Sequence, residues 1–308
     1  MELKPLKKWV ACIDLTNMDQ ALIGYINYLA TIFKPESVKF FHVIQSYDVF
    51  HDLIEEFPEL ETEEDLNELL SKQIQEEVTQ GFTHEGVELQ VEIRKGSPTG
   101  EIIRYIEKQQ PDLLILGKKA GYKGEGILAQ RIVKYVPCSV LFVPETSRYT
   151  LQNITVPVDF SEQSEIAARF ALNLVKPAGG RVMAQHLYDY PKQFFPYMPD
   201  KKTMKKMDEE LEAKKEAFLS KIKTPGDTDL DFELTLHKDG KMSDTIYDMC
   251  VSTQSDMIVV FAKARKNLLA LMNDKLPDRM ASYPFGLPLL ILKNKDRNQK
   301  LFSMFLKS

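Results

Sequence analysis

The sequence predicts an α/β protein with two tandem Rossmann-like domains, each a five-stranded parallel sheet with helices on both faces. Three observations lead to this fold class. A set of landmark residues recurs along the chain at a near-constant spacing. Each repeat alternates short apolar runs with longer segments of helical pattern. The fourth apolar run of each repeat is almost uninterrupted, which is typical of a central strand in a parallel sheet.

The repeat is visible in four pairs of residues that lie 144 or 145 positions apart. The pairs are Asp14 and Asp159, His42 and His186, Gly96 and Gly240, and Asp112 and Asp256. A spacing that holds over four landmarks indicates that one structural unit occurs twice. We therefore expect one domain at residues 1–146, a second at 147–293, and a C-terminal tail at 294–308.

Each element of the first half has its own sequence signal. Apolar runs predict strands, whereas Thr16 or Asn17 can cap a helix that Lys34-Pro35 brings to an end. The predicted strands are 8–13, 37–44, 87–94, 113–116 and 140–144. Helices are predicted from Thr16 or Asn17 to Ile32, in the polar segment 46–81, at 98–109, and from about Ile127.

The second half repeats this order of elements. Ser161 is the expected N-cap of a helix that runs to Val175, with Glu162 and Glu165 in its first turn. The predicted strands are 153–158, 181–187, 230–236, 257–261 and 289–293. Further helices are predicted at 200–223 and 242–253 and before the last strand. The apolar residues of the tail are expected to dock back onto the body.

Composition limits the class of protein. The chain has 308 residues, a net charge of −5 and three cysteines without a CxxC pair. This charge disfavours a nucleic-acid partner, and the scattered cysteines favour free thiols in a reducing compartment. No segment approaches the roughly 18 apolar residues that span a membrane. We expect a cytoplasmic protein with no nucleic-acid and no membrane partner.

One loop of the first half predicts an anion site. It follows the fourth strand and reads GKKAGYKGEGIL, with glycines at 117, 121, 124 and 126 and lysines at 118, 119 and 123. Glycines let backbone N–H groups approach a ligand closely, and a helix N-terminus favours negative charge. A phosphate cradle is therefore favoured over the alternative, a loop of solvated lysines.

The histidines do not predict a metal site. Their spacing matches no set of metal ligands, and His42 and His186 occupy equivalent places at strand ends. We expect these two to be structural residues with satisfied hydrogen bonds, and we expect no metal. The sequence Gly124-Glu-Gly126 also fits part of a dinucleotide fingerprint. It follows the fourth strand rather than the first, so an NAD site is not predicted.

Several short motifs follow one another along the two halves of the chain. They are Pro157-Val-Asp159-Phe-Ser161-Glu, its weaker echo Ile13-Asp14-Leu-Thr16, Gly96-Ser-Pro98-Thr-Gly-Glu101-Ile102, Pro111-Asp112-Leu-Leu-Ile-Leu-Gly117, and Pro137-Cys-Ser-Val140-Leu-Phe-Val-Pro144. Their order and spacing resemble those of the universal stress protein A family, in the form with two tandem domains. The resemblance spans nearly the whole chain.

The resemblance implies an adenine nucleotide alpha hydrolase-like fold, pairing of two domains and, in one branch of the family, ATP binding. The residues that map onto the ATP site are Ile13, Asp14, Val43, Gly117, Gly121, Gly124, Gly126 and Ile127. Two departures weaken the match. The glycine loop is shorter than in the family, and Ile127 replaces a hydroxyl residue, which removes a hydrogen bond of about 1 kcal/mol.

The second half departs from the family pattern in a different way. Its first-strand motif is well matched, and Val158, Asp159 and Leu187 occupy the places of the first site. Its loop after the fourth strand has no glycine, and Phe261 stands where Gly117 stands in the first half. We therefore predict a degenerate second site that does not bind ATP in the manner of the family.

These observations lead to two hypotheses of function. The leading one is a universal stress protein-like regulatory protein whose first domain binds ATP or AMP weakly. The alternative is an interaction or scaffold module with an unknown protein partner and two vestigial sites. No general base or magnesium ligand is evident, so an enzyme is not predicted, although weak ATP hydrolysis is left open. The two halves are expected to pair within one chain through their last strands, and a homodimer is also left open.

Overall fold

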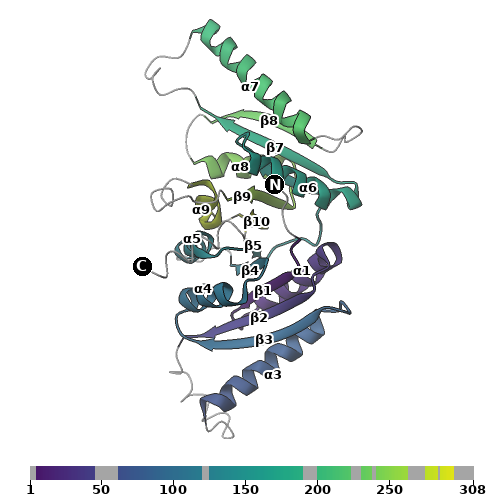
Figure 1. Cartoon of the computed structure of the whole chain (residues 1–308), viewed down its shortest axis with the longest axis vertical. Coiled ribbons are helices and arrows are strands. Elements are labelled where there is room, and N and C mark those ends of the chain that lie inside the picture. Colours follow the sequence, from purple (N-terminus) through teal and green to yellow (C-terminus); the bar gives the residue numbers. More distant parts are fainter. Residues whose placement is uncertain are drawn as a thin grey trace. The chain divides into compact units, whose positions relative to one another are not determined.

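A computed structural model of the chain describes residues 5–45, 62–119, 125–189, 200–222, 230–237, 241–262, 275–283 and 285–294. Strands and helices alternate along all of these segments, as the sequence predicts (Figure 1). The chain divides into two compact units. The first unit holds the described residues of Leu3–Tyr149 and Ala264–Ser308, and the second holds those of Thr150–Lys263.

The first unit is built on a parallel sheet in the strand order β3-β2-β1-β4-β5. Its elements are β1 (Lys8–Ile13), α1 (Met18–Phe33), β2 (Ser37–Ile44), α3 (Glu63–Gly81), β3 (Glu88–Lys95), α4 (Pro98–Gln109), β4 (Leu113–Lys118), α5 (Glu125–Tyr135) and β5 (Ser139–Pro144). The strand order reverses between β1 and β4, so the right-handed crossovers before and after that point place helices on both faces. Accordingly, α1 packs against α3, and α4 packs against α5.

The second unit repeats this sequence of elements. They are β6 (Asn153–Pro157), α6 (Glu162–Val175), the short 3₁₀ helix η1 (Lys176–Ala178), β7 (Arg181–Tyr188), α7 (Lys201–Ile222), β8 (Leu230–Leu236), α8 (Met242–Ser252) and β9 (Met257–Phe261). The strands are parallel in the order β9-β6-β7-β8. Because β6 and β9 take the places of β1 and β4, the duplication seen in the sequence is a duplication of structure.

The last two elements of the chain lie in the first unit. Helix α9 (Lys275–Ser282) packs against α5, and β10 (Leu289–Leu292) pairs with β5 in the antiparallel direction. The pairing joins Leu290 to Leu141 and Ile291 to Val140, and both strands are buried along their whole length. The last strands of the two sequence repeats thus pair with each other, as expected.

Two buried lysines fasten these elements. Lys293, which follows β10, donates from Nζ to the carbonyl oxygens of Val133 and Val136 at the end of α5, the latter at 2.6 Å. Lys118 of β4 donates in the same way to the carbonyls of Ala281 and Tyr283 at the end of α9, the former at 3.0 Å. Cations at helix C-termini satisfy carbonyls that have no intrahelical donor.

Asp112 and Asp256, which are equivalent in the two repeats, make equivalent hydrogen bonds in the two units. The Asp112 carboxylate accepts hydrogen bonds from the backbone N–H groups of Lys7 and Lys8, at 3.1 and 3.0 Å. The Asp256 carboxylate accepts from those of Gln152 and Asn153, at 2.8 and 3.0 Å. Each aspartate thereby ties the start of the fourth strand of its repeat to the start of the first.

The predicted element boundaries agree closely with the structure, with two differences. Helix α5 begins at Glu125 rather than near Ile127, so Gly126 lies in its first turn. Within the predicted helical segment 46–81, the described helix starts at Glu63, where Thr62 forms a capping box with Asp65. Residues 46–61 and nearly all of the predicted tail, 295–308, lie outside the described residues.

Candidate functional site

A cavity of about 400 Å³ opens at the carboxyl edge of the sheet in the first unit. Its walls are formed by the ends of β1, β2 and β4 together with the starts of α1 and α4 and part of α5. This is where the strand order reverses, the usual position of ligand sites in open α/β sheets. Four of the predicted site residues line it: Ile13, Asp14, Val43 and Gly117.

The turn between β1 and α1 places Asp14 at the cavity, and the Asp19 side chain accepts hydrogen bonds from the backbone of this turn. Leu15 has a φ of 59°, in the left-handed region of backbone conformation that residues other than glycine seldom adopt. The backbone N–H of Leu15 donates to Asp19 Oδ2 at 2.7 Å, and that of Asp14 donates to Asp19 Oδ1 at 3.2 Å. Both oxygens of one buried carboxylate therefore stabilise this uncommon turn.

Asp19 is itself in an unfavourable setting for a charge. The residue is only 2% exposed. Burial raises the pKa of Asp19 to about 6, with the nearby carboxylates of Asp14 and Glu77 acting in the same direction and the two backbone hydrogen bonds acting against it. The group changes charge close to neutral pH, which is unusual for an aspartate.

Asp14 forms an ion pair across the mouth of the cavity. Lys119 Nζ lies 2.7 Å from Asp14 Oδ2, and Thr16 Oγ1 donates to Asp14 Oδ1 at 2.6 Å. Partial burial alone would raise the pKa of Asp14, but the hydrogen bonds from Lys119 and Thr16 outweigh it and leave the pKa lowered. Asp14 therefore stays ionised, and one lysine of the predicted anion loop already contacts it.

The two repeat-equivalent histidines make equivalent structural bonds, as the sequence analysis expects. His42 Nδ1 lies 3.0 Å from the Ile13 carbonyl, and His186 Nδ1 lies 2.8 Å from that of Val158. A carbonyl can only accept, so Nδ1 donates in each case and the neutral ring keeps Nε2 as an acceptor. His42 also lines the cavity of the first unit.

The glycine loop is described only at its two ends. Gly117 is the second-last residue of β4, and a Cβ atom there would come within 2.9 Å of Met18 Cγ, so close packing against α1 is one reason for a glycine. Gly121 and Gly124 lie outside the described residues. Gly126 and Ile127 lie in the first turn of α5, where backbone N–H groups have no intrahelical acceptor.

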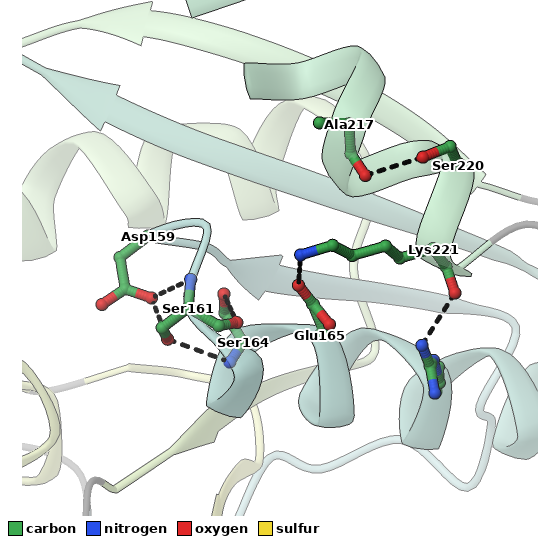
Figure 2. Close-up of polar contacts among 8 residues, drawn as sticks. Asp159, Ser161, Ser164, Glu165, Ala217, Ser220 and Lys221 are labelled. Atoms are coloured by element: carbon green, nitrogen blue, oxygen red, sulfur yellow. Dashed lines mark hydrogen bonds and ion pairs between the residues drawn. The ribbon is translucent and has the colours of Figure 1, made fainter. Parts of the chain in front are cut away.

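The second unit uses the equivalent turn differently (Figure 2). Asp159 Oδ1 accepts from the backbone N–H of Ser161 at 3.1 Å and from its hydroxyl, while Ser161 Oγ caps α6 by accepting from Ser164 N at 3.3 Å. The predicted cap is confirmed. Position 164, which corresponds to Asp19, holds a serine whose hydroxyl donates to the Ser161 carbonyl. No carboxylate from this position supports the turn.

Aromatic packing fills the neighbourhood of that second turn. Phe160 has a φ of 60°, like Leu15, and its ring lies 4.2 Å from that of His186 and 6.0 Å from that of Phe232. Val158 is buried at the end of β6, and Leu187 lies half-buried in β7. The loop after Phe261 is outside the described residues from position 263 onward.

Helix α7 is tied to α6 by polar contacts next to the same turn (Figure 2). Lys221 Nζ lies 2.7 Å from Glu165 Oε1, and Arg169 Nη2 donates to the Lys221 carbonyl at 2.7 Å. Glu165 is only 8% exposed, and a buried charge requires a close partner, which here is the Lys221 ammonium group. These contacts are structural and bring no further chemistry to the second site.

Two features of the first site are not predicted by the sequence: the role of Asp19 and the contact of Lys119 with Asp14. Asp19 lies in the first turn of α1, where a carboxylate usually serves the helix dipole alone. Its alignment with Ser164 at the repeat spacing was the available signal, since it marks a charge present in one copy only. Lys119 was placed in the anion loop, but its contact with Asp14 depends on how the loop leaves β4.

Other kinds of site find no support in the part of the chain that the structure describes. None of its groups of His, Cys, Asp and Glu could hold a metal ion. All three cysteines are free, with Cys138 and Cys250 buried and burial raising the pKa of the Cys12 thiol. None of the described helices is long and apolar enough to cross a membrane.

Solved structures similar to this chain share its whole architecture. A functionally unknown protein from Pseudomonas aeruginosa PAO1 covers 98% of this chain and 98% of its own, with a TM-score of 0.62 and 13% identity. A universal stress protein from Archaeoglobus fulgidus DSM 4304 covers 96% of this chain and 99% of its own, with a TM-score of 0.61 and 15% identity. At such identities the likeness shows the fold alone.

The sequence itself identifies the family. A search of curated proteins finds no significant match to the chain. The Universal stress protein family, however, matches it twice, at residues 6–144 and 150–274. The two matches follow the two sequence repeats and together cover most of the chain. The chain therefore belongs to the universal stress protein family and carries two of its domains in tandem.

Proposed function

We propose that the first sequence repeat binds an adenine nucleotide, ATP or AMP, and that the second repeat supports it without binding ATP in the same way. Membership of the universal stress protein family supports a role in the stress response. The observation that carries the nucleotide proposal is the cavity of the first unit, where Ile13, Asp14, Val43 and Gly117 lie together at the reversal point of the sheet.

The chemistry of the cavity suits a nucleoside with a short anionic tail. Phe41, Ile102, Leu116 and Leu128 provide an apolar wall for a base, and the ionised Asp14 can accept hydrogen bonds from ribose hydroxyls or a base amino group. The N–H groups in the first turn of α5 have no acceptor within the helix and favour phosphate. A phosphate would also offer Lys119 a second anionic partner, which frees Asp14 for the ligand.

Calorimetry with ATP and AMP on the intact chain tests this proposal. We expect binding in the micromolar to millimolar range, weakened by about tenfold in Asp14→Ala, because one charged hydrogen-bond acceptor is lost. A Gly124→Val, Gly126→Val variant should weaken binding further by obstructing backbone approach. Asp159→Ala is the matched control, since it removes the equivalent carboxylate from the second unit and should leave affinity unchanged. Absence of binding at millimolar ligand refutes the proposal.

A second candidate function is an interaction or scaffold module with both sites vestigial. The specific observation in its favour is that both turn carboxylates already have partners, Asp14 in Lys119 and Asp159 in Ser161. Under this alternative the intact chain copurifies with a protein and shows no heat with either nucleotide. We propose no catalytic role in either case, and a phosphate-release assay with turnover above background would contradict that.

A further inference from the structure

On the basis of the nucleotide site proposed above, we propose that the Asp19 carboxylate is a positioning residue for the turn that presents Asp14, and that protonation of Asp19 weakens nucleotide binding. The first step is geometric. Asp19 is buried beneath residues 13–16 and bonds the backbone of both Asp14 and Leu15. It lines the cavity itself, so it is adjacent to any ligand that Asp14 contacts.

A comparison of the two repeats shows whether the turn itself requires a carboxylate at the position of Asp19. Both repeats need a left-handed residue after the first strand, Leu15 in one and Phe160 in the other. The second repeat forms its turn with Asp159, Ser161 and Ser164, and uses no carboxylate at the position of Asp19. A buried charge is therefore not required to make the turn, and it occurs in the repeat that has the glycine loop.

Charged groups from several elements lie near Asp19. Asp14 from the turn and Glu77 from α3 act on its carboxyl directly, whereas Lys119 from the loop after β4 and His42 from β2 line the same cavity. Lys119 is already paired with Asp14. Burial is the largest cause that raises the pKa of Asp19 to about 6, and the carboxylates of Asp14 and Glu77 act in the same direction.

Protonation changes what Asp19 can do for the turn. The ionised carboxylate accepts one N–H bond on each oxygen, whereas a carboxylic acid carries a proton on one oxygen and accepts there poorly. At acid pH one of the two bonds is lost, and Leu15 loses part of the support for its left-handed backbone. Asp14 is then less well positioned, and a ligand must order the turn as it binds.

The sign of the pH dependence separates positioning from simple electrostatics. An ionised Asp19 near an anionic ligand would repel it, so electrostatics alone predicts tighter binding as the pH falls. Positioning predicts the reverse, with affinity lost as the pH falls through about 6. Because phosphate groups of nucleotides titrate near the same pH, each measurement needs a variant without the Asp19 carboxyl as its reference.

The test compares AMP affinity of the intact wild type, Asp19→Asn and Asp19→Ser at neutral pH and near pH 5. Asp19→Ser installs the residue found at the equivalent position of the second repeat. We expect the wild type to lose about tenfold more affinity on acidification than either variant, the effect of one hydrogen bond. His42→Gln is the control for a second ring or carboxyl group of the cavity lining, because it leaves Asp19 in place, and it should retain the extra loss.

A ligand-free measurement keeps the proposal testable if a variant folds poorly or AMP does not bind. In the NMR spectrum of the wild type, the amide resonances of Asp14 and Leu15 should shift together with a midpoint near pH 6 as Asp19 titrates. No such titration, or a titration without any effect on AMP affinity, overturns the role of Asp19. Titrating amides in a chain that binds no AMP refute the nucleotide site instead.

Discussion

At the scale of single residues, three aspartates that each accept two backbone hydrogen bonds differ in how well their charge is compensated. Asp112 and Asp256 each accept two backbone N–H bonds from the start of the first strand of their repeat, so their charge is well compensated. Asp19 also accepts two backbone bonds, but burial and its anionic neighbours outweigh them. All three residues are aspartates, so the difference comes from their surroundings.

The strand-tying aspartates should be important for folding in both repeats. Asp112→Ala and Asp256→Ala each leave two backbone N–H groups without their acceptor, and we expect each to lower the free energy of unfolding by about 2–3 kcal/mol. Urea denaturation measures this directly. Asp208→Ala, at an exposed position on α7, is the control and should change stability by less than about 0.5 kcal/mol. Equal effects at all three positions would contradict the proposed role.

Asp19 should make stability depend on pH in a defined window. Its folded-state pKa of about 6 lies above the unfolded value of about 3.9, so the native state binds the proton more tightly. The resulting stabilisation is complete below about pH 4 and is lost as the pH rises through about 6. Unfolding curves of wild type and Asp19→Asn should therefore differ least in acid and diverge toward neutral pH, with the variant relatively more stable there.

Acidification should stabilise the fold through Asp19 while weakening the ligand site, so global stability and affinity change in opposite directions. If the two quantities fall together on acidification, Asp19 is acting through general unfolding. Parallel melting and binding measurements on the same samples distinguish the two cases.

At the scale of elements, the ends of α5 and α9 are held by lysines from neighbouring strands. Lys293 and Lys118 are buried, at 7% and 8% exposure, and each bonds two carbonyls at a helix C-terminus. A lysine here satisfies groups that would otherwise be buried without a donor. The same contacts fix α9 and β10 within the first unit.

Removal of one such donor should be costly. Lys293→Met keeps the length of the side chain but leaves the carbonyls of Val133 and Val136 without their ammonium donor, so we expect a loss of about 2–3 kcal/mol in unfolding free energy. Lys205→Met, at an exposed position on α7, is the matched control with an expected change below about 0.5 kcal/mol. Thermal unfolding of Lys293→Met that overlays the wild type would show that the bonds contribute nothing.

At the scale of the whole molecule, the chain supplies its own partner for β5. Strand β10 pairs with β5 along an edge that is buried on both sides, and α9 packs beside it on α5. An uncovered apolar edge strand is a template for pairing with another chain. The tandem arrangement therefore covers within one polypeptide a surface that a single domain would leave open.

A fragment of residues 1–149 tests this reading of the edge. Without α9 and β10 it exposes β5, so we expect it to self-associate more strongly than the intact chain at equal concentration. Light scattering after gel filtration measures the difference. A fragment that is monomeric at that concentration would contradict the prediction.

Much of this architecture was predictable because it is written in local patterns. Apolar runs, caps such as Ser161 and the repeat spacing place nearly every described strand and helix within a few residues. The clustering of Asp14, Val43 and Gly117 also followed from one rule, that the carboxyl ends of parallel strands meet at the switch point. Whether nucleotide binds there stays a prediction.

The sequence by itself determined the fold class, the duplication and the inequality of the two repeats, since each depends on residue types and their spacing along the chain. The tertiary structure decided which groups meet across it. The structure brings Lys119 into contact with Asp14 and places Asp19 next to the turn that it supports. It also brings Lys118 and Lys293 to the C-terminal ends of helices more than 150 positions away in the sequence. Such contacts depend on packing between distant elements and on burial, which local patterns do not specify.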